Sequence, residues 1–171
     1  MKRFLCLLLI LSLFLSGCQI PGERIKDPVT FYYVQSEYQS GNIRPEFQTD
    51  ITSIIASEDR EAAGHKDDLA YLLALYLMGP SEDDLVSPIP RGTQIFSVEE
   101  TIAGISIKLS DTAKTMTDVE YTLACACLSL TCLELSNAEK VTVSSGSRAV
   151  TMTRENLLLL EDVTTATEET K

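Results

Sequence analysis

Residues 117–145, TDVEYTLACACLSLTCLELSNAEKVTVSS, decide the fold of this chain. Residues 117–135 carry apolar side chains at helical spacing on two nearly opposite sides, which predicts a helix that is buried all round. Residues 140–145 alternate between apolar and polar side chains and are predicted as the next strand. The two apolar stripes of the helix are Val119, Leu123, Ala126, Leu130 and Leu133, and Tyr121, Cys125, Leu128, Cys132 and Leu135.

Two arrangements are open for these stripes. In the first, one stripe packs on a sheet and the other on a second helix or a covering loop. In the second, one stripe meets another copy of the protein. Ordinary core packing explains most such stripes, so we expect the first arrangement.

Strand patterns lie on both sides of this helix. Residues 29–38 are aromatic and β-branched, Ser40–Asn42 favour a turn, and residues 47–57 supply a second strand before a polar connection. Residues 93–110 are predicted as a hairpin, with Ile105, Ile107 and Leu109 on one face of its second strand. Residues 148–153 are predicted to return after a turn, and the run LLLLED from Leu157 to form a last strand or a short helix.

A shorter amphipathic helix is predicted from Lys66 onward. Asp67 and Asp68 lie at its start, where the helix dipole favours acidic side chains, and Gly79-Pro80 ends it. Its apolar face consists of Leu69, Leu72, Leu73, Tyr76 and Leu77.

The predicted order of elements is therefore β-β-α-β-β-α-β-β across residues 29–160. Both helices are expected to cover one face of a mixed or antiparallel sheet, which gives a two-layer α+β domain. The length suits one core and is too short for two. Residues 161–171 are predicted to be a disordered acidic tail.

The N-terminus has the layout of a secretory leader. Lys2 and Arg3 precede the apolar run Phe4–Leu15, whose length as a helix is roughly 18 Å, well short of a bilayer core of roughly 30 Å. Leu15-Ser16-Gly17-Cys18 resembles a bacterial lipobox, in which the thiol receives diacylglycerol and the chain is cut before the cysteine. We therefore expect a signal peptide at 1–17, a lipidated Cys18 bearing acyl chains such as palmitate, and a tether at 18–28. The expected location is the extracytoplasmic face of the cytoplasmic membrane.

The chain is acidic, with a formal charge of −11 that falls by two, to −13, when Lys2 and Arg3 leave with the leader. This charge argues against nucleic acid as a partner, because phosphates require basic side chains. Of the five cysteines, Cys6 leaves with the leader and Cys18 carries lipid. Cys125, Cys127 and Cys132 share one helix with poor geometry for a disulfide or a zinc site, so we predict free, buried thiols and no metal.

No catalytic constellation is predicted. His65 is the single histidine and follows Gly64 in a polar connection. The paired carboxylates Glu58-Asp59, Asp83-Asp84 and Glu99-Glu100 are adjacent residues of the kind that is usually solvated. The acidic run Ser81–Asp84 lacks the spacing of a calcium loop, and no glycine-rich phosphate loop is present. We predict neither enzymatic activity nor a cofactor.

Several motifs resemble those of the GerMN domain family of sporulation and spore germination, in the order and spacing found here. They are Leu77-Met78-Gly79-Pro80, Ile89-Pro90-Arg91-Gly92, Gly104, Leu109-Ser110, Tyr121-Thr122-Leu123 and Lys140-Val141. Lys108, where the family usually has an acidic residue, and Ser145-Gly146, where it often has Asp-Gly, depart from the pattern. The resemblance implies a non-enzymatic scaffold or interaction module that contacts envelope proteins or further copies of itself.

Two other functions are kept as alternatives. A lipoprotein that binds a peptidoglycan fragment or another small ligand would need a concave site with aromatic groups, and Tyr32, Tyr33 and Tyr38 form the aromatic cluster available for it. A weak hydrolase would depend on Glu99 or Asp84.

Overall fold

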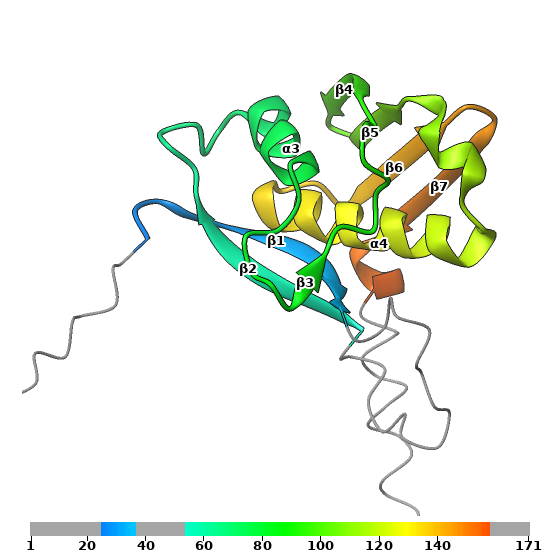
Figure 1. The fold of residues 1–171 in the computed structure, drawn as a ribbon. Coiled ribbons are helices and arrows are strands. Elements are labelled where there is room, and N and C mark those ends of the chain that lie inside the picture. The colour runs from blue at the N-terminus through cyan, green and yellow to red at the C-terminus, as the bar shows by residue number, and fades with distance from the viewer. Residues whose placement is uncertain (1–24, 37–53, 158–171) are drawn as a thin grey trace, which may run out of the picture.

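The computed structural model describes residues 25–36 and 54–157 (Figure 1). The leader, Cys18, most of the tether, Tyr38, the predicted turn at Ser40–Asn42 and the acidic tail lie outside the described residues. The elements in chain order are β1 (Pro28–Gln35), β2 (Ile55–Glu61), α3 (Leu69–Leu77), β3 (Leu85–Val86), β4 (Ile95–Thr101), β5 (Gly104–Leu109), the 3-10 helix η3 (Asp111–Thr115), α4 (Asp118–Leu135), β6 (Lys140–Ser145) and β7 (Arg148–Thr153).

The strands form two sheets. In the first, β1 is central and pairs antiparallel with β2 and with the short β3. The second has the order β4-β5-β6-β7, in which β5 and β6 run parallel and the outer pairs are antiparallel. The helix α4 is the crossover between β5 and β6, which the parallel pairing requires. The predicted α+β class is confirmed, while the single predicted sheet is replaced by two.

Helix α4 contacts both sheets. It contacts β1 of the first sheet and both β6 and β7 of the second (Figure 1). Of the two apolar sides of the helix, one is buried in the core and the other is only partly covered. The stripe from Tyr121 through Cys125 and Leu128 to Cys132 is buried throughout. The stripe from Val119 is fully buried at Ala126 and Leu133.

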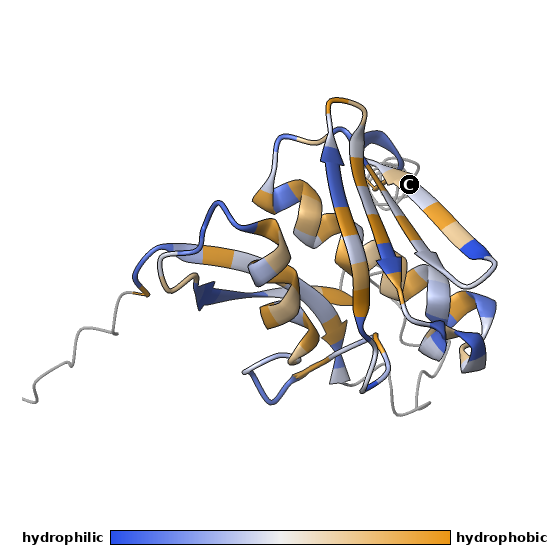
Figure 2. Ribbon diagram, turned by 90° about the horizontal axis from the view of Figure 1, so that it is seen from above, coloured by the Kyte–Doolittle hydropathy of each residue, from blue (hydrophilic) through white to orange (hydrophobic). Residues whose placement is uncertain are grey.

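One core runs through both sheets and both helices. Apolar and polar positions alternate along β5 and β6, so that one face of the second sheet packs on α4 (Figure 2). On the other side of the core, the Tyr76 ring of α3 stacks on Tyr33 of β1 at a centroid distance of 4.7 Å and lies edge-on to Phe31 at 5.9 Å. These aromatic contacts join α3 to the first sheet.

The helix ends follow from their capping residues. The Asp68 carboxylate accepts the backbone N–H of Tyr71 at 3.0 Å and starts α3, and Gly79 beyond its end adopts a φ of +90°. At the start of α4, the Thr117 hydroxyl accepts the N–H of Glu120 at 3.3 Å, and the Glu120 carboxylate accepts the N–H of Thr117 at 2.7 Å. This capping box confirms the predicted start of the second helix.

Three details differ from the sequence prediction. The strand expected at 47–57 is described only from Ile55 and extends to Glu61, through charged residues assigned to a polar connection. Residues 81–92, with prolines at 88 and 90, were expected to be a loop but contain β3, and η3 precedes α4. Of the predicted final element, only Leu157 is described.

Candidate functional site

The paired carboxylates are not assembled into a catalytic site. Glu58 is 3% exposed, and its carboxylate accepts the N–H groups of Ser81 and Glu82 at 2.9 and 3.1 Å and the Ser81 hydroxyl at 3.1 Å. Its neighbour Asp59 points the other way and accepts the Thr30 hydroxyl at 2.8 Å. The two carboxylates of this pair therefore bind different segments of the chain, the loop at Ser81 and strand β1.

The other acidic residues are exposed and spread over different elements. Asp83 and Asp84 lie on the loop before β3. Glu99 and Glu100 follow each other on β4, opposite Ser106 and Ile105 respectively, so their side chains leave opposite faces of the strand. Two carboxylates that flank one scissile bond must face each other, and these do not.

His65 lies on the exposed connection before α3. Its ring stacks on the exposed Tyr71 ring at a centroid distance of 4.1 Å, and its backbone N–H donates to Ala62 at 2.9 Å. Across residues 25–36 and 54–157, no group of three or more His, Cys, Asp or Glu side chains is placed to hold a metal ion.

The three helical cysteines are free and buried, as predicted. Burial raises the pKa of Cys125 to about 11 and the pKa of both Cys127 and Cys132 to about 12. A reactive cysteine needs the opposite, a lowered pKa and access to solvent. These thiols are core residues.

The aromatic cluster is divided by the strand that carries it. Tyr33 is fully buried, and its hydroxyl donates to the carbonyl of Tyr76 at 3.0 Å. Tyr32 points to the opposite side and lines a surface groove. Its backbone N–H donates to the Thr131 hydroxyl of α4 at 3.0 Å, which ties the edge of β1 to the helix.

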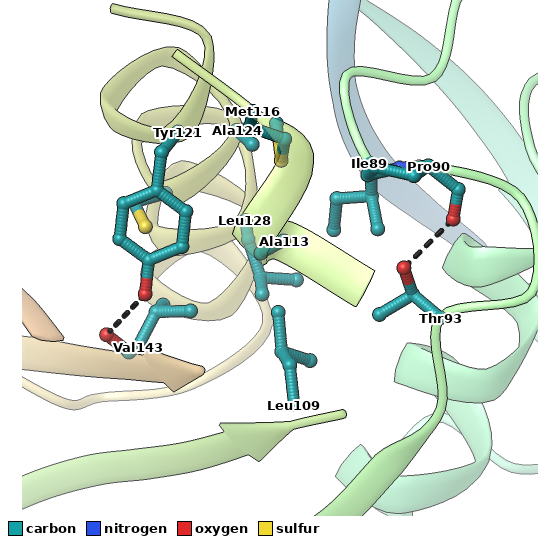
Figure 3. Close-up of a pocket in the computed structure, with 11 residues that line it drawn as sticks. Ile89, Pro90, Thr93, Leu109, Ala113, Met116, Tyr121, Ala124, Leu128 and Val143 are labelled. Atoms are coloured by element: carbon teal, nitrogen blue, oxygen red, sulfur yellow. Dashed lines mark hydrogen bonds between the residues drawn. The ribbon is translucent and has the colours of Figure 1, made fainter. Parts of the chain in front are cut away.

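A small space inside the core lies where η3, α4 and the loop before β4 meet (Figure 3). Its volume is about 10 Å³, roughly the minimum for one water molecule. The Tyr121 hydroxyl that borders it donates to the carbonyl of Val143 at 3.4 Å, and the Thr93 hydroxyl donates to Pro90 at 2.7 Å (Figure 3). This space is too small for an organic ligand.

A larger concave surface runs along α4 and has a volume of about 720 Å³. The stripe from Val119 forms its floor, β7 provides one wall, and the end of the first sheet provides the other. Asp118, Thr122 and Asn156 supply most of its polar groups. We call this surface the α4 groove. Its lining is Tyr32, Ile54, Ile55, Asp118, Val119, Thr122, Leu123, Ala126, Leu130, Val150, Thr151, Met152, Asn156 and Leu157.

The sequence predicted the apolar stripe that forms the floor of the α4 groove, but it did not predict which residues form the walls. Val119 is 78% exposed and Leu123 and Leu130 are half-buried, so the expected cover is incomplete among the described residues. The walls could not be foreseen, because they come from β1, β2 and β7, which are distant in sequence.

The outer face of the second sheet is a second open surface. Ser106 and Lys108 of β5, Ala149 and Thr151 of β7, and Glu99 of β4 are exposed on it, and no described helix covers it (Figure 2). Most of its side chains are short and uncharged, in contrast to the acidic chain as a whole.

Two solved structures are similar to this chain. The tandem GerMN domains of the sporulation protein GerM from Bacillus subtilis align with a TM-score of 0.47 and 16% identity over 71% of this chain, which spans 39% of that protein. A Clostridium perfringens protein described as a putative lipoprotein aligns with a TM-score of 0.45 and 14% identity, over 75% of this chain and 89% of its own. No curated protein sequence matches.

The family comparison covers most of the described domain. The model of the Germane family, described as sporulation and spore germination, matches residues 30–151. None of the helices in the described part of the chain is both long and apolar enough to span a bilayer. The resemblance predicted from the sequence motifs is therefore confirmed, and the chain belongs to the Germane (GerMN) family of sporulation and spore germination domains.

Proposed function

We propose that this chain is a lipid-anchored, non-enzymatic interaction module of the cell envelope. Lipid on Cys18 holds it at the extracytoplasmic face of the cytoplasmic membrane, and its Germane domain contacts other envelope proteins during spore envelope assembly or germination. The observation that carries the proposal is Leu15-Ser16-Gly17-Cys18 at the end of a short basic and apolar leader, on a chain that continues into a Germane domain.

The acidic, basic and thiol side chains that could take part in catalysis instead make structural contacts, which supports an interaction role. Glu58 orders the loop at Ser81, and Arg60 donates to the last carbonyls around α3, at Leu75 and Gly79. Arg154 binds carbonyls at the end of α4, including Ser136 at 3.2 Å. The three described thiols are buried with raised pKa values.

The outer face of the second sheet is the surface we assign to protein partners. Short hydroxyl and methyl side chains lose little conformational entropy on contact. Ser106, Ala149 and Thr151 fit this description, and the sheet beneath them packs on α4 through β6 and β7.

Fractionation and acyl labelling test the anchor. In the native host, Cys18→Ser is expected to remove label from a fatty-acid precursor such as palmitate and to release the chain from the membrane pellet. Cys6→Ser, a change to the other cysteine of the leader region, is the matched control. It is expected to keep both the fatty-acid label and the association with the membrane pellet. Label on the Cys18→Ser variant would contradict the proposal.

Photo-crosslinking tests the partner surface. A photoreactive residue at Ser106 or Thr151 is expected to capture envelope proteins, or further copies of the chain, in sporulating cells. The same residue at the exposed Asn137, beyond α4, is the control. Equal capture from both places would reject the sheet face as the contact surface.

A second candidate function is binding of a small ligand such as a peptidoglycan fragment. The volume of the α4 groove falls within the range of ligand pockets, and Tyr32 lines it. Chemical-shift changes at Tyr32 and Leu123 on titration with muropeptides would favour this function over a protein partner.

A further inference from the structure

The α4 groove is an apolar surface that lacks a matching cover among the described residues. Val119, Leu123, Ala126 and Leu130 repeat at helical spacing along its floor, and Val150 and Met152 of β7 form one wall. Tyr32 and Ile55 form the other wall. Soluble proteins seldom leave such a continuous apolar stripe in water.

The described chain ends at this groove. Beyond β7, Arg154 donates to the carbonyls of Ser136 at 3.2 Å and of Ala138 at 3.4 Å. The backbone N–H of Asn156 donates to the Thr153 hydroxyl at 3.2 Å. These bonds turn the chain away from the strand direction, and the next residue, Leu157, lines the groove and packs against the core.

The sequence after this point suits the groove. Leu158, Leu159 and Leu160 follow Leu157 directly, and Glu161 and Asp162 end the apolar run. The described chain ends in helical conformation at residues 154–157, and three further residues reach from about 4.5 Å as helix to about 10 Å when extended, which is at most the width of a helix of about 10 Å. The acidic residues would then emerge at the rim.

We propose that Leu158–Leu160 lie in the α4 groove of their own chain and cover the stripe from Val119 to Leu130. The segment is tethered at Leu157, so its local concentration at the groove exceeds that of any second molecule. The groove is then part of the core, and partners bind elsewhere on the domain. This inference stands independently of the anchor on Cys18.

Engineered disulfides test the location of the segment. The chain from residue 19 onward is prepared with Leu123→Cys in the groove and a cysteine at 158, 159 or 160 in turn. The native thiols are buried and do not compete. After mild oxidation, at least one pair is expected to form an intramolecular disulfide roughly tenfold faster than the same tail cysteine paired with Ser106→Cys on the outer sheet face.

Three results would overturn the proposal. Equal rates with Leu123→Cys and Ser106→Cys would show that the tail has no preference for the groove. Disulfide-linked dimers that increase with protein concentration would assign the groove to a second copy. Faster closure between Leu123→Cys and Phe47→Cys than with any tail cysteine would assign it to residues 37–53.

A dye-binding measurement gives a second readout that needs no crosslink. Replacing Leu158, Leu159 and Leu160 by Ser is expected to uncover the groove and increase the fluorescence of 8-anilinonaphthalene-1-sulfonate severalfold, with helix content unchanged by circular dichroism. The matched control changes Thr164, Thr165 and Thr167 to Ser and is expected to leave the signal at the wild-type level. Equal fluorescence in all three proteins would reject the proposal.

Discussion

The guanidinium carbon of Arg148 lies 4.0 Å from the centre of the Tyr121 ring, and the Tyr121 hydroxyl donates to the carbonyl of Arg148 at 3.3 Å. The same guanidinium donates to the carbonyls of Ala113 and Met116 at 3.2 and 3.0 Å and to Asp118 at 3.0 Å. One side chain of β7 therefore joins η3 to the start of α4. Burial raises the pKa of the Tyr121 hydroxyl to about 12.

Arg148→Lys is expected to lower the free energy of unfolding by about 2 kcal/mol. A lysine keeps the charge but has no planar fork, so it cannot reach several carbonyls while it stacks on a ring. Urea denaturation of the variant against Arg91→Lys, an exposed position, measures the difference. Equal midpoints for the two variants would show that the arginine geometry does not matter.

Glu58→Gln is expected to destabilise the domain by about 2 kcal/mol. The buried carboxylate accepts two backbone N–H groups and a hydroxyl and lies 3.8 Å from Arg60, and a neutral amide weakens each of these contacts. Asp59→Asn changes the adjacent, exposed carboxylate in the same way and should cost less than about 1 kcal/mol. Thermal unfolding of both proteins measures the two losses of stability. A larger loss for Asp59→Asn than for Glu58→Gln would contradict the prediction.

The periodic parts of the chain were predictable from sequence. Helix α4, β5 and β6 each have an apolar pattern that matches their geometry. These elements can be predicted from local sequence, because the spacing of their own apolar side chains determines both the type of element and the face that is buried.

The parts that depend on distant partners were not predictable. Glu58 is charged, so β2 was expected to end before it, yet its carboxylate is satisfied by Ser81 and Glu82 from beyond α3. The strand β3 exists through its pairing with Val34 and Gln35. The same limit applies to the α4 groove, whose floor is one helix and whose walls come from both sheets.

Gly104→Ala is expected to lower the free energy of unfolding by at least about 3 kcal/mol or to prevent folding. Gly104 has a φ of +132°, and a Cβ there would lie 2.4 Å from the carbonyl oxygen of Lys140, inside the pairing of β5 with β6. Gly92→Ala is the matched control, because Gly92 also has a positive φ of +85° but has nothing within 4 Å of its Cβ position. The control should show only the backbone cost of about 1–2 kcal/mol. Guanidinium unfolding of both variants provides the comparison, and similar losses would mean that the contact with Lys140 is relieved by a small backbone shift.

The stability of the domain is expected to fall steeply at alkaline pH. Burial raises the pKa of Cys125, Cys127 and Cys132 from 9.0 to about 11, 12 and 12. Between pH 9 and 12, the unfolded chain loses these protons while the folded chain retains them, so the free energy of the unfolded state falls relative to that of the folded state. The stability that the three protonated thiols contribute is fully present below pH 9 and is lost as the pH rises toward their pKa values in the folded protein. We expect a loss of at least about 1 kcal/mol per pH unit above pH 9.

Urea midpoints at pH 7.5, 9 and 10.5, on the chain from residue 19 onward, measure this slope. Cys127→Ala is the informative variant, because it removes one titrating group and should reduce the slope even though the smaller side chain lowers stability at every pH. The folded protein should also react slowly with a disulfide reagent at pH 8, and the unfolded protein quickly, since the thiolate is the reacting species. Rapid labelling of all three thiols in the folded protein, or an unchanged slope in the Cys127→Ala variant, would mean that α4 is not buried between the two sheets as described.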